Sequence, residues 1–120
     1  MKLGIPSLGE KGLEESISPH FGRGPTFTLY DPELEEVTVI ENTSEHRGGT
    51  GQPPELLKKN GVDVMLCANL GRRAVRLFDE YGIEVYCGAQ GTVKDAIEAW
   101  KNDRLEKAND ANVCDEGHKH

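Results

Sequence analysis

Short apolar runs in the first third of the chain predict three strands. Residues 2–6 form a brief apolar run typical of a buried strand that ends at a proline. Residues 26–30 and 36–41 alternate between apolar and polar positions and are rich in β-forming side chains. Residues 31–35, which contain Asp-Pro, predict a hairpin turn between them. Residues 7–25 are rich in glycine and serine and predict a loop.

The pattern then changes to alternating helices and strands. A helix is expected to open at Pro53-Pro54, where the missing N–H group has no cost, and to end at Asn60-Gly61. Residues 62–68 are apolar except for Asp63, which favours a central parallel strand. A second helix follows and stops at Gly82; its expected buried stripe is Ala74, Leu77, Phe78 and Tyr81.

The last two elements complete the same alternation. Residues 83–87 predict another short strand, and Thr92 is a good N-cap for a third helix. The expected buried stripe of that helix is Val93, Ala96, Ile97 and Trp100. The order βββαβαβα predicts an α/β domain with three layers and a mixed five-stranded sheet over residues 1–109. Residues 110–120 are polar and poorly periodic and are expected to form a tail outside the fold.

Composition narrows the class of protein. The chain has 120 residues, enough for one domain, and its 14 basic and 21 acidic side chains give a net charge of −7. This surplus argues against a nucleic-acid or anionic-membrane surface. Six of the acidic residues lie in the segment from Asp31 to Glu45, and this segment contains no Lys or Arg. The charge therefore does not exclude a compact anionic ligand elsewhere.

Other features suggest a cytoplasmic protein. No run reaches the roughly 18–20 apolar residues of a membrane span, and the first residues do not form a signal peptide. Three widely spaced cysteines, without a Cys-x-x-Cys pair, do not suggest a disulfide framework. Cys67 ends the apolar run of residues 62–68 and is better explained as a small buried side chain than as a ligand.

Three loops carry residues that suit a ligand. His20 and Arg23 lie three residues apart in a loop shaped by Gly and Pro, and could offer a soft nitrogen to a metal and fixed donors to an anion. Gly48, Gly49 and Gly51 precede a predicted helix, where backbone N–H groups favour negative charge. Plain surface loops are the alternative explanation for both.

Asn69 follows the strand predicted for residues 62–68, at an edge where open α/β sheets bind ligands. Asn69 could equally be an ordinary N-cap, and the nearby Arg72, Arg73 and Arg76 could form a solvated helix face. The pattern of residues leaves both interpretations of this segment open.

The tail gathers a thiol and two imidazoles, Cys114, His118 and His120, which suit zinc or copper. The spacing is not that of a standard zinc finger, so a polar tail that binds metal only incidentally is the alternative. The chain also has no G-x-S-x-G or H-E-x-x-H motif and no carboxylate between Leu3 and Pro6 to hold nuclease metal ions. The missing carboxylate argues against a metal-dependent nuclease.

Taken in order, the loops resemble the dinitrogenase iron–molybdenum cofactor biosynthesis family, which includes NifX-type proteins and the carboxy-terminal domain of NifB-type proteins. The resemblance covers about residues 1–105. It depends on the order of the segments Ser18-Pro19-His20-Phe21-Gly22-Arg23, Gly48-Gly49-Thr50-Gly51, Asn69-Leu70-Gly71, Tyr81-Gly82-Ile83-Glu84-Val85-Tyr86 and Gly91-Thr92-Val93. Arg72 departs from the pattern, since relatives usually have proline there.

The resemblance implies a ribonuclease H-like three-layer fold and a non-catalytic role as an accessory of nitrogen fixation. It implies binding or carriage of a metal–sulfur cluster of the Fe-Mo, Fe-S or Mo-Cu type, exchanged with donor and acceptor proteins. By motif match His20 would be the cluster ligand. We expect Arg23, Gly48, Gly49, Gly51 and Asn69 to complete the site. A small-molecule or nucleotide-binding regulatory module on the same loops is the alternative function.

Overall fold

The computed structural model describes residues 1–19, 24–43 and 53–108. Within these ranges the chain forms one sheet, three α-helices and a single-turn 3-10 helix. The strands are β1 (Leu3–Ser7), β2 (Thr26–Asp31), β3 (Glu36–Glu41), β4 (Val64–Leu66), β5 (Glu84–Cys87) and β6 (Glu106–Lys107). The helices are α1 (Pro53–Lys59), α2 (Arg72–Glu80) and α3 (Val93–Lys101), and the 3-10 helix is η1 (Gly12–Glu14).

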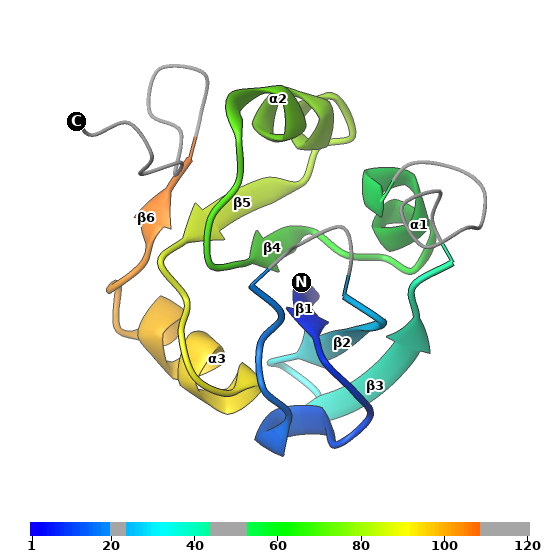
Figure 1. The fold of residues 1–120 in the computed structure, drawn as a ribbon, viewed down its shortest axis with the longest axis vertical. Helices are drawn as coiled ribbons and strands as arrows, with labels where there is room; N and C mark the ends of the chain where they lie inside the picture. The colour runs from blue at the N-terminus through cyan, green and yellow to red at the C-terminus, as the bar shows by residue number, and fades with distance from the viewer. Residues whose placement is uncertain (20–23, 44–52, 109–120) are drawn as a thin grey trace.

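The sheet has the strand order β3-β2-β1-β4-β5-β6 (Figure 1). Strands β1, β4 and β5 pair in parallel, with Leu3 opposite Val64 and Val64 opposite Glu84. Strands β2 and β3 extend the sheet as an antiparallel hairpin on one side of β1. Strand β6 pairs antiparallel with β5 on the other side. The carboxyl ends of β1, β3, β4 and β5 therefore lie along one edge of the sheet.

Helices cover both faces of the sheet, so the fold has three layers (Figure 1). On one face, side chains of α1 and α2 pack against the sheet, with Phe78 and Leu57 fully buried beside Phe27 and Met65. On the other face α3 and η1 cover a second cluster. That cluster includes Leu3, Ile5, Leu66, Val93 and Ala96. Burying each large apolar side chain contributes about 1.5–3 kcal/mol, so these two clusters hold the layers together.

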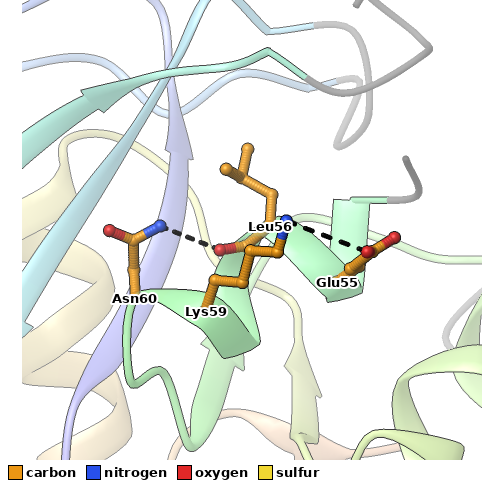
Figure 2. A network of polar contacts seen from close by, with 4 residues as sticks. All are labelled: Glu55, Leu56, Lys59 and Asn60. Atoms are coloured by element: carbon orange, nitrogen blue, oxygen red, sulfur yellow. Dashed lines mark hydrogen bonds and ion pairs between the residues drawn. The ribbon is translucent and has the colours of Figure 1, made fainter. Parts of the chain in front are cut away.

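Helix α1 begins directly at Pro53 and ends one turn after Glu55 (Figure 2). The Asn60 side-chain amide donates to the carbonyl oxygen of Leu56 at 2.9 Å and so caps the last turn. The Lys59 ammonium lies 3.9 Å from the Glu55 carboxylate, with both side chains largely exposed. An exposed pair of this kind contributes little to stability, so the Asn60 cap and the buried Leu57 define the helix end.

Helix α3 is closed at its start by a capping box. The Thr92 hydroxyl accepts from the Asp95 backbone N–H at 3.2 Å, and the Asp95 carboxylate accepts from the Thr92 N–H at 3.0 Å. Val93, Ala96 and Ile97 then lie buried, as their spacing predicts, and Trp100 is half-buried. The predicted N-cap at Thr92 is confirmed.

The prediction of five strands was wrong, because the described part of the sheet has six. Strand β6 consists of Glu106 and Lys107, two exposed charged residues that give no apolar signal. Its pairing with β5 continues at Ala108, whose N–H donates to the Val85 carbonyl oxygen at 2.9 Å. An exposed ion pair between Lys107 and Glu84, 3.6 Å apart, also joins the two strands. The α/β class, the mixed sheet and the three helices are as predicted.

Three smaller differences concern element bounds. The strand expected over residues 62–68 is only β4, because the segments on both sides of it are held by loop hydrogen bonds. In α2 the buried side chains are Val75 and Phe78, while Ala74, Leu77 and Tyr81 are half-buried. The loop after β1 contains the single turn η1.

In the described part of the chain, no helix combines the length and the apolar character needed to cross a bilayer.

Candidate functional site

Four connecting segments begin at the edge where β1, β3, β4 and β5 end. Strand β1 leads into residues 8–25, β3 into residues 42–52, β4 into residues 67–71 and β5 into residues 88–92. The last three segments lead into the first turns of α1, α2 and α3, so all three helices begin at this edge. Ligands of open α/β sheets bind at such an edge. We therefore take it as the candidate site.

A buried network of hydroxyl groups supports this edge from below. The Ser7 and Thr26 hydroxyl oxygens lie 2.7 Å apart, and the Thr28 hydroxyl donates to Ser7 at 2.9 Å. The Thr26 hydroxyl also lies 2.7 Å from the carbonyl oxygen of Gly9, to which it can donate. Each of these three side chains is at least nine-tenths buried. A buried hydroxyl group is costly unless it is hydrogen-bonded. The network therefore fixes the end of β1 and the start of β2, between which residues 8–25 run.

Both ends of the loop that carries His20 and Arg23 are anchored to the sheet. The Ser18 N–H donates to the Pro6 carbonyl oxygen at 2.9 Å, and the Asn42 side-chain amide donates to the Gly24 carbonyl oxygen at 2.9 Å. Asn42 is 4 % exposed and also donates its own N–H to Pro25. Asn42 therefore joins the end of β3 to the end of this loop. Ser18 and Gly24, on either side of residues 20–23, therefore both lie at the candidate edge.

Asn69 lies at the same edge, exposed, between the end of β4 and the start of α2. Its alternative role as the N-cap of α2 was wrong, because the N-cap is Gly71 and no side chain caps this helix. The structure gives the Asn69 amide no hydrogen bond to any described residue. A polar side chain at this edge that has no partner among the described residues is available to a ligand.

The first turn of α2 concentrates positive charge at this edge. It carries Arg72 and Arg73, both exposed, and no acidic residue. Neither guanidinium forms an ion pair with a described residue. A helix N-terminus already carries a partial positive charge and is stabilised by anions, so two arginines there oppose the usual preference. This arrangement favours the binding of a negatively charged ligand, or of a neighbouring anionic group, at the N-terminus of α2.

The start of α3 differs, because its own carboxylate occupies it. Hydrogen bonds from the Thr92 backbone and side chain hold the pKa of Asp95 below its ordinary value. Asp95 stays charged at neutral pH and fills the place that an external anion would take. Of the two longer helices that begin at this edge, α3 is capped by its own carboxylate, whereas no described side chain caps the N-terminus of α2.

Cys67 ends β4 just below the edge and is fully buried. Burial raises the pKa of its thiol to about 12. Its sulfur lies 3.7 Å from the Tyr86 carbonyl oxygen and 4.0 Å from the sulfur of Cys87. Because a metal ligand must be the thiolate, a protonated and inaccessible Cys67 fits the predicted role of a packed core side chain.

Most of the predicted ligand residues lie outside the described residues: His20, Arg23, Gly48, Gly49, Gly51, Cys114, His118 and His120. Their roles stay predictions. Among residues 1–19, 24–43 and 53–108, no three His, Cys, Asp or Glu side chains are grouped closely enough to hold a metal ion. The structure therefore places three features at the same edge of the sheet: the anchored ends of the His20 loop, Asn69 and the first turn of α2.

Sequence reasoning missed the supporting residues Ser7, Thr28 and Asn42. Thr26 and Thr28 alternate with apolar residues on β2, which indicated that one face of this strand carries polar side chains. That Ser7 is their partner depends on how β1 pairs with β2, which the sequence does not show.

A cavity of about 510 Å³ lies elsewhere, between α2, β5 and β6. It is lined by Asp79, Glu84 and Lys107 among others, and by none of the predicted ligand residues.

Comparison with known proteins gives the same fold. A structure of a protein from Thermotoga, described as a candidate NifB protein, is 36 % identical with a TM-score of 0.75; the match covers 88 % of this chain and 91 % of that one. The apo form of the orange protein from Desulfovibrio gigas is 22 % identical with a TM-score of 0.79, covering 89 % and 92 %. The second likeness, at this identity, concerns the fold alone.

The sequence comparisons agree. An uncharacterized protein of Methanocaldococcus jannaschii is 30 % identical over 113 residues, which is 89 % of this chain and 91 % of that protein. The family model described as dinitrogenase iron-molybdenum cofactor matches residues 1–103, which include every described element except β6. The chain therefore belongs to the dinitrogenase iron-molybdenum cofactor family.

Proposed function

We propose that this protein binds and carries an anionic metal–sulfur cluster of the iron–molybdenum type at the carboxyl edge of its sheet. The observation that carries the proposal is the first turn of α2, where Arg72 and Arg73 and an N-terminus without a side-chain cap meet. Membership of a family named for the iron–molybdenum cofactor supplies the cargo. Cluster chemistry resides in the metal and sulfide ions, so the protein contributes binding and protection and no catalytic step.

Each part of the edge has a distinct role in this proposal. His20 provides a soft nitrogen ligand to a cluster metal, which suits an imidazole. Arg23, together with the backbone N–H groups of Gly48, Gly49 and Gly51, balances the negative charge of the cluster. The Asn69 amide, with the N–H groups at the start of α2, adds hydrogen bonds from the neighbouring strand.

Reconstitution without oxygen tests the proposal. The purified protein is titrated with isolated iron–molybdenum cofactor or with tetrathiomolybdate, and binding is followed by visible absorption and metal analysis. We expect stoichiometric binding, loss of the metal-specific spectral change in H20A, and weaker binding in R72A/R73A. An unchanged spectrum at stoichiometric cluster would count against the proposal. Stabilisation by nucleotides and not by clusters would favour the regulatory alternative.

Two further variants separate the role of the site from the net charge of the protein. Gly71→Asp places a carboxylate at the N-cap of α2, where it competes with the cluster for the same N–H groups. Lys58→Ala removes one positive charge at the opposite end of the sheet, in the last turn of α1. We expect Gly71→Asp to weaken cluster binding and Lys58→Ala to leave it unchanged. Equal weakening in both would show that only overall charge matters.

A further inference from the structure

Strand β3 is the outermost strand on one side of the sheet (Figure 1). It is also the most exposed of the longer strands. Each of its six side chains is exposed or half-exposed, and Val37 is 39 % exposed. The strand pairs with β2 in one uninterrupted register from Glu36 opposite Asp31 to Glu41 opposite Thr26. It contains no proline, and no bulge interrupts that register. A long regular edge of this kind can accept another strand.

The register shows which backbone groups face outward. The Asn42 N–H donates to Pro25, which extends the same register, so this pair is a hydrogen-bonded one. Such pairs alternate along an antiparallel ladder, which makes Ile40, Thr38 and Glu36 the residues bonded to β2. The N–H and C=O groups of Val37, Val39 and Glu41 therefore point away from β2. No described residue bonds to them.

Charge along this edge restricts what can pair with it. Residues 31–41 contain five carboxylates and no Lys, Arg or His. Asp31 accepts the N–H groups of Glu33 and Leu34 and so closes the turn. The other four carboxylates form no ion pair with a described residue. A second copy of residues 31–41 would bring five like charges against these five, which disfavours self-pairing; a basic segment would neutralise them.

We propose that β3 is an interaction edge that accepts an extended, lysine- or arginine-rich segment of a partner protein as an added strand. Main-chain hydrogen bonds to Val37, Val39 and Glu41 give affinity, and the flanking carboxylates select a basic partner. Exposed Leu34 and Val37 offer apolar contacts beside these charges. Glu41 ends β3 at the candidate site, so a partner held here lies next to the loops of that site. The interaction does not depend on a bound cluster.

Amide hydrogen exchange measured by NMR tests this directly. The probe is a capped peptide of alternating lysine and valine, of the length of β3. When the peptide fills about nine-tenths of the sites, we expect exchange at Val37, Val39 and Glu41 to slow by about tenfold, because only the free fraction exchanges. Thr38 and Ile40 already donate to β2 and serve as internal controls. No slowing at the three outward amides would overturn the proposal.

Matched probes and variants separate strand addition from simple charge attraction. A peptide of the same sequence with N-methylated backbone amides cannot pair as a strand, and we expect it not to protect β3. The E36Q/E41Q variant should bind the lysine peptide severalfold more weakly, whereas E80Q/E98Q, with the same charge change on α2 and α3, should bind it normally. Equal protection by the methylated peptide would overturn the proposal.

Analytical sedimentation of the protein without peptide tests whether a second copy of the chain, rather than a basic partner, pairs with β3. We expect the protein to be monomeric and the amides of Val37, Val39 and Glu41 to exchange fast. A dimer with those three amides already protected would show that a second copy occupies this edge, and would overturn the assignment to a basic partner.

Discussion

Gly24 and Gly71 lie at the same edge of the sheet in different surroundings. A Cβ atom at Gly24 would lie 2.8 Å from the Ser18 Cβ and 3.2 Å from the Ser7 carbonyl oxygen. A Cβ atom at Gly71 would meet no atom of the described residues within 4 Å, and Gly71 has an extended backbone open to any residue. Close packing therefore requires glycine at position 24, at the end of the His20 loop. At Gly71, the N-cap of α2, the described residues leave room for a side chain.

We expect Gly24→Ala to lower the free energy of unfolding by about 1–3 kcal/mol, because the new methyl group would force Ser18 to move. Gly71→Ala is the matched control and should change it by about 0.5 kcal/mol or less. Urea unfolding followed by circular dichroism measures both. Equal effects of the two substitutions would show that close packing at Gly24 is not what requires glycine there.

The buried thiol of Cys67 should make stability depend on alkaline pH. Its pKa is raised to about 12 in the folded protein, so above pH 9 the unfolded chain has released a proton that the folded chain still holds. Stability from this group is complete below the unfolded pKa and is lost as pH rises toward the folded one. We expect a loss of about 1 kcal/mol between about pH 8 and about pH 10.

The comparison with Cys67→Ala isolates this effect, because the other groups that titrate in this range are common to both proteins. The variant should be less stable at about pH 8, since it loses buried contacts, but its stability should fall less steeply with pH. Parallel pH profiles for the two proteins would mean that Cys67 is not held protonated by burial.

Among the elements, the start of α3 illustrates how a local signal determines structure. We expect Thr92→Ala to destabilise the protein by about 1 kcal/mol, because the first turn loses its cap. The variant should also lose part of its acid sensitivity. The pKa of Asp95 is lowered by Thr92, so the stability that this carboxylate adds is present at neutral pH and is lost as pH falls through its folded pKa.

Acid unfolding of the native protein and of Thr92→Ala measures this difference, with Thr92→Ser as the control that keeps the hydroxyl. The serine variant should stay close to the native protein at every pH. A difference between native protein and Thr92→Ala that is the same at neutral and acid pH would contradict the coupling to Asp95.

Elements that carry their own signal could be predicted, and elements that depend on pairing could not. The bounds of β3 follow from alternation and the Asp-Pro turn, and the cap at Thr92 follows from its neighbours. Strand β6 has no such signal, since Glu106 and Lys107 are exposed charged residues whose place in the sheet depends on pairing with β5. The site behaves in the same way: its loops could be predicted, but the contact of Ser7 with Thr28 and the N-cap at Gly71 depend on how the strands and helix pack.

For the whole molecule, the position of β6 raises the question of where the folding unit ends. The family match stops at residue 103, but Leu105 packs against the α3 cluster and Ala108 is 7 % exposed in the cluster of α1 and α2. We expect a chain ending at Ala108 to unfold cooperatively with native stability under reducing conditions. A chain ending at Asp103 should lose about 1–3 kcal/mol, because it loses the buried part of Leu105, Ala108 and the pairing with β5.

The same two truncations test the predicted metal site of the tail. Both lack Cys114, His118 and His120, so both should lose any tight zinc or copper binding while keeping the cluster binding proposed for the carboxyl edge. Calorimetric titration with each metal measures the first property, and the spectral titration with cluster measures the second. Zinc or copper bound stoichiometrically by the chain ending at Ala108 would place the site outside the tail. Cluster binding lost in that chain, despite native stability, would move the proposed cargo site toward the tail.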